Sequence, residues 1–99
     1  MDIAKFRASL EEAAPPPGLP PLVQALWHAA KGNWDTAHGL AQDDGSAEGA
    51  WVHAYLHRVE GDESNAGYWY HRAGKPHCHA GLDAEWADLA GTLLQAAPL

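Results

Sequence analysis

The chain has 99 residues, enough for one domain built around a single hydrophobic core. Its apolar fraction of 46% includes five tryptophans, and this composition argues against a disordered chain. With 13 acidic and 6 basic residues the formal net charge is −7, which argues against nucleic acid and anionic membranes as partners, because phosphate groups need a basic surface.

The sequence predicts an all-α fold. Val, Ile and Thr are few, and no run alternates apolar with polar residues between turn signals, so strands are not expected. Ala, Leu, Glu and Gln dominate between Gly and Pro residues, which is typical of short helices joined by tight turns. Six helices are expected, over residues 2–14, 21–31, 34–42, 47–60, 63–73 and 84–97.

Turn and cap residues set these boundaries. The proline-rich segment before Pro21 breaks the first helix, and Pro21 itself suits the first turn of the next helix, where no backbone N–H is needed. Gly32 is a natural left-handed end for that second helix. Ser46, Asp62 and Asp83 are expected to cap the fourth, fifth and sixth helices.

The middle of the chain contains an internal repeat. A shift of 29 residues places Gly32 on Gly61, Asn33 on Asp62 and Ala37 on Ala66. Each copy therefore reads as a helix, a Gly-Asn or Gly-Asp turn, and a second helix with a small residue near its start. Glycine permits the sharp reversal, Asn or Asp caps the second helix, and alanine lets the paired helices approach closely.

These copies resemble tetratricopeptide repeats. Residues 32–37 (GNWDTA) are similar to the Gly-Asp-Tyr-x-x-Ala turn between the paired helices of that family, and residues 66–73 (AGYWYHRA) resemble the Ala-x-x-Trp-Tyr-x-x-Ala helix of its SEL-like branch. The likeness covers residues 21–74. It implies short antiparallel helical hairpins with a peptide-binding groove. The Trp- and His-rich sequence also resembles small bacterial proteins of uncharacterised function.

The repeat departs from the family pattern in two ways, which shape the expected organisation. Its 29-residue shift is shorter than the usual period of about 34, and two repeats are fewer than the roughly three that bury a stacked core. We therefore expect one domain over residues 1–99 in which flanking helices cap the hairpins. An amino-terminal helix and Pro-rich connector (1–20) precede the two hairpins (21–74), and a loop and carboxy-terminal helix (75–99) follow.

Cysteine content and hydropathy indicate the compartment. The single cysteine, Cys78, cannot form an internal disulfide, which fits a reducing environment. No segment reaches the roughly 18 consecutive apolar residues of a membrane helix, and the first ten residues lack the apolar run of a signal peptide. A cytoplasmic protein is expected.

Three residues on one face of the fourth helix are candidate metal ligands. His53, His57 and Glu60 are spaced i, i+4 and i+7, and two histidines one turn apart with a carboxylate form a chelating geometry. His28, the repeat partner of His57, would join them if the hairpins stack. The alternative is that the His57 and His28 rings only pack at helix contacts and that His53 is solvated, since Ala54 stands where the zinc-helix motif has glutamate.

Another face of the same helix is a candidate partner-binding surface. Trp51, Tyr55 and Arg58 follow one another at i, i+4 and i+7. In the family that the repeats resemble, such positions line the peptide groove, and aromatic residues and arginine are frequent in interface hot spots. The alternative is that Trp51 and Tyr55 are core residues, as aromatic stripes usually are.

The loop around Cys78 is a weaker candidate. His77, Cys78 and His79 are adjacent soft ligands, but neighbours in sequence rarely point at one ion and no second cysteine completes a structural zinc site. Phosphate-binding glycine loops, nucleophile elbows and calcium loops are absent from the sequence, so no cofactor is expected.

Three functions are compatible with these features. The favoured one is a protein- or peptide-interaction module using Trp51, Tyr55 and Arg58. The alternative is a small metal-binding protein or histidine-dependent enzyme using His53 and the residues on its face. The third is a homodimer that closes an apolar helix face against itself.

Overall fold

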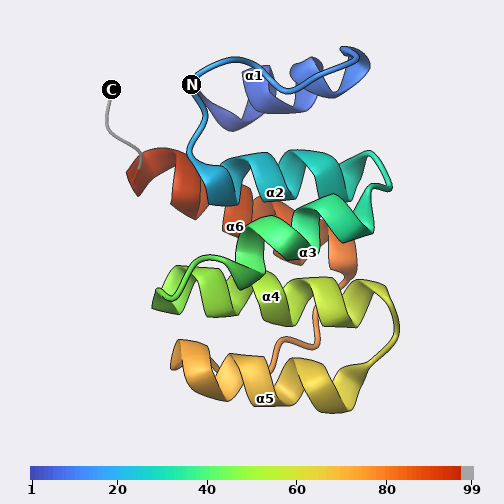
Figure 1. The fold of residues 1–99 in the computed structure, drawn as a ribbon, viewed down its shortest axis with the longest axis vertical. Helices are drawn as coiled ribbons and strands as arrows, with labels where there is room; N and C mark the ends of the chain where they lie inside the picture. Colours follow the sequence, from blue (N-terminus) through green and yellow to red (C-terminus); the bar gives the residue numbers. More distant parts are fainter. Residues whose placement is uncertain (97–99) are drawn as a thin grey trace.

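All regular elements of the described chain are helical. The computed structural model describes residues 1–96, and within that range no strand is formed (Figure 1). The elements are α1 (Ile3–Ala8), η1 (Ser9–Glu11), α2 (Pro21–Ala30), α3 (Trp34–Gln42), α4 (Ala47–Val59), α5 (Glu63–Ala73) and α6 (Leu82–Ala96). The expected all-α fold is confirmed for this range. The predicted extension of the last helix to Ala97 lies outside the described residues.

The helices from α2 to α5 follow one another in a stack, as Figure 1 shows, with α2 and α3 forming one hairpin and α4 and α5 the next. The two hairpins meet where α3 packs on α4. Helix α6 returns across the stack and contacts α2 and α4, and it also contacts α1. Because of this return, residues near the end of the chain pack against the second hairpin.

The two hairpins turn in the same way. Gly32 and Gly61 adopt φ values of 81° and 86°, in the left-handed region that favours glycine. In the first turn the Asn33 N–H donates to the His28 carbonyl at 2.9 Å, and in the second the Asp62 N–H donates to the His57 carbonyl at 2.8 Å. These bonds satisfy carbonyl groups that the helix ends leave free. The turns therefore match at the 29-residue shift seen in the sequence.

The predicted caps at Ser46 and Asp62 are confirmed, and the one at Asn33 is wrong. The Ser46 side chain accepts a bond from the Gly49 N–H, and Asp62 accepts one from the Asn65 N–H, both at 3.0 Å. Asn33 makes no side-chain cap bond to α3. The start of α3 is fixed instead by the preceding turn and by Trp34, whose indole N–H donates to the Leu56 carbonyl of α4 at 2.7 Å.

The predicted first helix is too long. Helical structure over residues 2–14 was expected, but α1 ends at Ala8 and one 3₁₀ turn carries the chain to Glu11. The Ser9 hydroxyl donates to the Phe6 carbonyl at 2.6 Å, a local bond that competes with continued α-helix. Glu12 is already extended, at ψ 162°, as the chain approaches its proline-rich segment.

The start of the last helix also differs from the prediction. Helix α6 begins at Leu82, so Asp83 lies in its first turn instead of capping it. An acidic side chain in that turn still interacts favourably with the helix dipole. Helix α6 therefore begins two residues earlier than predicted.

Helix α4 is the centre of the core. Every residue from Gly49 to His57 is buried, so this helix has no broad solvent-facing side. The largest fully buried side chains come from α4 itself and from the helices packed in the same core: Phe6, Val23, Leu26, Trp27, Val52, Leu56, Tyr70 and Leu89. Trp86 of α6 donates its indole N–H to the Leu26 carbonyl at 2.8 Å and stacks on Phe6 at 5.5 Å. None of the helices in residues 1–96 combines the length and apolar character needed to cross a membrane.

Candidate metal centre

Three histidines meet between the two hairpins. One ring nitrogen each of His38, His53 and His57 lies within 4.8 Å of the other two. The Nε2 atoms of His38 and His53 are 2.9 Å apart. The rings of His53 and His57 lie face to face with centroids 4.8 Å apart, as expected for residues one turn apart on α4. The predicted pair is therefore joined by His38, which the sequence reasoning missed.

His38 reaches the cluster because α3 packs on α4. It belongs to the second helix of the first hairpin, whereas His53 and His57 belong to the first helix of the second hairpin. The cluster thus spans the contact between the hairpins. His28, proposed as a further ligand, belongs to no group of candidate ligands found among residues 1–96.

Two tryptophans hold these rings in place. Trp69 of α5 stacks on His53 at 3.8 Å between ring centroids, with the planes 14° apart. Trp34 stacks on His38 at 4.6 Å and 12°, and its own indole is fixed by the bond to α4. His53 is only 5% exposed, which excludes the interpretation that this ring is solvated. Stacked, largely buried rings have few alternative rotamers, which favours a preorganised site.

The electrostatics keep two of these rings neutral. Burial, together with the neighbouring His38 and His57, lowers the pKa of His53 to about 4. Burial also lowers the pKa of His38, with His57 adding to the effect and the carboxylates of Glu60 and Asp35 opposing it. At neutral pH both imidazoles are therefore uncharged, and uncharged imidazole is the form that binds a metal ion.

Glu60 lies against His57 and not against His53. Its Oε1 atom is 2.7 Å from His57 Nδ1. It belongs with His57 and Asp62 to a second group of candidate ligands. A carboxylate on one nitrogen of a histidine fixes the ring and increases the basicity of the other nitrogen, as outer partners of metal-binding histidines do. The three residues predicted as ligands are thus distributed over two adjoining groups.

The arrangement suits a transition-metal ion. Imidazole nitrogens are common ligands of zinc and copper, and three of them leave one position of a tetrahedral ion for water. Zn–N bonds of about 2.0–2.1 Å place the nitrogens of a tetrahedral ion roughly 3.3 Å apart. The His38 and His53 nitrogens at 2.9 Å would need to separate by only a few tenths of an ångström.

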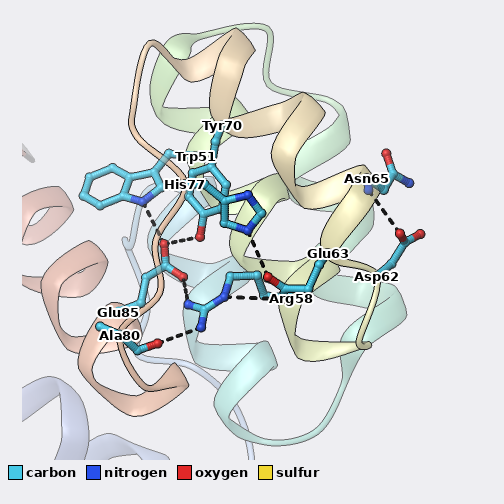
Figure 2. A network of polar contacts seen from close by, with 9 residues as sticks. All are labelled: Trp51, Arg58, Asp62, Glu63, Asn65, Tyr70, His77, Ala80 and Glu85. Carbon is cyan, nitrogen blue, oxygen red and sulfur yellow. Dashed lines mark hydrogen bonds and ion pairs between the residues drawn. The ribbon is translucent and has the colours of Figure 1, made fainter.

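The predicted partner-binding residues have contacts inside the molecule. Trp51 and Tyr55 are each 6% exposed. As Figure 2 shows, the indole N–H of Trp51 and the guanidinium of Arg58 both point to Glu85 of α6, at 3.3 and 2.7 Å. Arg58 also donates to the Ala80 carbonyl at 2.6 Å. Sequence reasoning missed Glu85, since nothing in its spacing links it to α4.

Glu85 is the centre of a buried polar network. It is 3% exposed and also accepts a bond from the Tyr70 hydroxyl of α5 at 2.5 Å. Burial and the bond to Glu85 raise the pKa of Tyr70. Burial alone would lower the pKa of Arg58, but its bond to the carboxylate outweighs this and raises it. The network links α4, α5 and α6 to one another. The burial and hydrogen bonds of Trp51, Arg58 and Tyr70 are therefore explained by a role in stabilising the fold.

The loop histidines pack against this network. His77 Nε2 lies 2.9 Å from Glu63 Oε1 (Figure 2), and the His77 and His79 rings stack at 4.9 Å. Cys78 is half-buried. Among residues 1–96, neither group of candidate ligands includes these three residues.

Comparison of the chain with protein-family models, with curated proteins and with solved structures gave no match. Function resides in sites carried by a fold more than in the fold itself. The arrangement of the described side chains is therefore the basis for a functional proposal.

Proposed function

We propose that the protein binds a divalent transition-metal ion, of the zinc or copper type, through His38, His53 and His57. The observation that supports it best is the convergence of one nitrogen from each ring within 4.8 Å, at a buried contact between two helices. Imidazole ligands at this separation match the requirements of such an ion, and the lowered pKa values of His38 and His53 keep these two rings uncharged at neutral pH.

The surroundings add to the proposal. The Glu60 carboxylate orients His57, and Trp69 and Trp34 fix the other two rings. Supports of this kind are typical of metal-binding histidines.

The interaction module that the sequence favoured has less support. Trp51, Tyr55 and Arg58 offer little surface to a partner, since the first two are buried and Arg58 is paired with Glu85. It stays a prediction for other surfaces of the molecule. The tetratricopeptide likeness likewise stays a proposal, supported by the matching hydrogen bonds of the two turns and by the fully buried Ala37 and Ala66.

The test is zinc binding by the full-length protein without a histidine tag. Competition with a chromophoric chelator should show one tight zinc ion per chain that requires the cluster. His38→Gln should weaken binding by more than about 100-fold, because loss of an outer partner alone costs about 10- to 100-fold. His71→Gln, which changes an exposed histidine outside the cluster, is the matched control and should bind like wild type. Equal zinc affinity in wild type and His38→Gln would overturn the proposal.

A further inference from the structure

A second group of candidate ligands adjoins the three histidines. His57 Nδ1 lies 2.7 Å from the Glu60 carboxylate, and one oxygen of Asp62 lies within 4.8 Å of both residues' ligand atoms. His57 is buried, whereas Glu60 and Asp62 are exposed. The group thus runs from the core to the surface, at the turn between α4 and α5.

His57 belongs to both groups, and an imidazole has two nitrogens that can each bind a metal ion. We propose that His57 bridges two metal ions, with the second held by His57 Nδ1, Glu60 and Asp62. This inference rests on the proposed function, because the first ion occupies the three-histidine cluster.

Binding of the second ion releases one proton from His57. In the metal-free protein, the tautomer of His57 that carries its proton on Nδ1 donates a hydrogen bond to the Glu60 carboxylate. The second ion replaces that proton, which leaves to solvent, so that His57 becomes an imidazolate bonded to one ion through each nitrogen. The negative charge of the imidazolate and the two carboxylates offset the charge of the neighbouring ions. One nitrogen and two carboxylate oxygens leave further positions for water, as the exposed side of the group allows.

The turn holds Asp62 in place for this role. Its N–H donates to the His57 carbonyl at 2.8 Å, which fixes the backbone of Asp62 beside the end of α4. Its Oδ1 accepts the Asn65 N–H as the cap of α5. Because Oδ1 is engaged by the helix, Oδ2 would be the oxygen that binds the second ion. The same left-handed turn that reverses the chain thus carries a ligand to the acidic side of His57.

The first experiment counts the ions bound by untagged full-length protein, with zinc alone as the probe. Equilibrium dialysis at increasing zinc should give one tightly bound ion and then a second, weaker one. In Asp62→Asn the second ion should be lost and the first kept, because asparagine caps a helix as well as aspartate does but has no negative charge. Asp43→Asn, an exposed substitution outside both groups, should still bind two.

The outcomes separate the two proposals. A wild-type protein that saturates at one ion overturns the second position and leaves the proposed function standing. Absence of any stoichiometric ion overturns both. Retention of two ions by Asp62→Asn overturns the assignment of the second position to this turn.

A copper experiment tests the bridge itself. In protein loaded with two Cu²⁺ per chain, an imidazolate bridge couples the two spins, so the integrated electron paramagnetic resonance signal should fall below that of two isolated ions. A signal equal to two independent copper ions would overturn the bridging role of His57.

Discussion

Glu85 is the residue on which the buried polar network depends. It receives hydrogen bonds from Trp51, Arg58 and Tyr70, which come from two helices. A buried charge pair adds little net stability when it is compared with apolar packing, but removal of one partner leaves the other charge buried without compensation. The consequence of losing this carboxylate should therefore be large.

We predict that Glu85→Gln lowers the free energy of unfolding by about 3 kcal/mol, because the largely buried Arg58 side chain loses its close counter-charge and keeps only the exposed Glu63 carboxylate at 3.7 Å. Urea unfolding followed by circular dichroism measures the change. Glu48→Gln, which changes an exposed carboxylate of α4, should stay within about 0.5 kcal/mol of wild type. Equal effects of the two substitutions would show that the network contributes no special stability.

Tyr55 makes the free energy of unfolding depend on pH in the alkaline range. Burial, with the nearby carboxylates of Glu85 and Asp83, raises its pKa to about 12. The folded protein therefore holds this proton more tightly than the unfolded chain, whose tyrosines titrate near pH 10. The resulting stabilisation is complete below pH 10 and is lost as pH rises from 10 towards 12.

Tyr55→Phe should make the fall in stability between pH 9 and pH 11 shallower. It should not abolish the fall, because burial also raises the pKa of Tyr70. Urea midpoints measured at half-unit pH intervals give the slope for each protein. A slope in Tyr55→Phe as steep as that of wild type would mean that Tyr55 does not hold its proton in this way.

Part of the candidate site is visible in the sequence at the scale of residues. His53 and His57 could be paired because helical spacing alone puts them on one face. His38 and Glu85 could not be found in this way, since each comes from another helix and meets α4 only after packing. Spacing within a helix is local information, whereas contacts between helices depend on crossing geometry that the sequence pattern does not specify.

At the scale of elements, the left-handed glycines decide where the hairpins reverse. A side chain added at Gly61 would meet no atom within 4 Å, so its cost is backbone strain alone. We predict that Gly61→Ala lowers the unfolding free energy by about 1–2 kcal/mol. Gly39→Ala is the matched control in open space within α3, and it should raise stability by about 0.5–1 kcal/mol, because alanine favours helix. Thermal or urea unfolding should show these opposite signs, and a loss in both variants would contradict the assignment.

Helix bounds could be predicted where strong turn residues flank the helix. The bounds of α3 and α5 are as expected, because a left-handed glycine turn precedes each of them. The first helix was overestimated because the local bond of Ser9 and the extended Glu12 end it early. Single polar side chains shift such ends by amounts that periodicity does not resolve.

At the scale of the whole molecule, the return of α6 across the stack completes the core. It brings Trp86 against Phe6 and Leu26, and it brings Glu85 to α4. The sequence predicted a carboxy-terminal helix but not the surface against which it packs. A metal ion held by His38, His53 and His57 would in addition join the two hairpins, since its ligands come from α3 and α4.

The most direct test of this account is thermal unfolding of the untagged protein with and without zinc. At a free zinc concentration of 100 times the dissociation constant, binding to the folded state alone adds about 2.7 kcal/mol. For a domain of this size that raises Tm by roughly 10–20 °C. Wild type and His71→Gln should show the rise and His38→Gln should not. An unchanged Tm in wild type, or the same rise in His38→Gln, would contradict a metal centre between the hairpins.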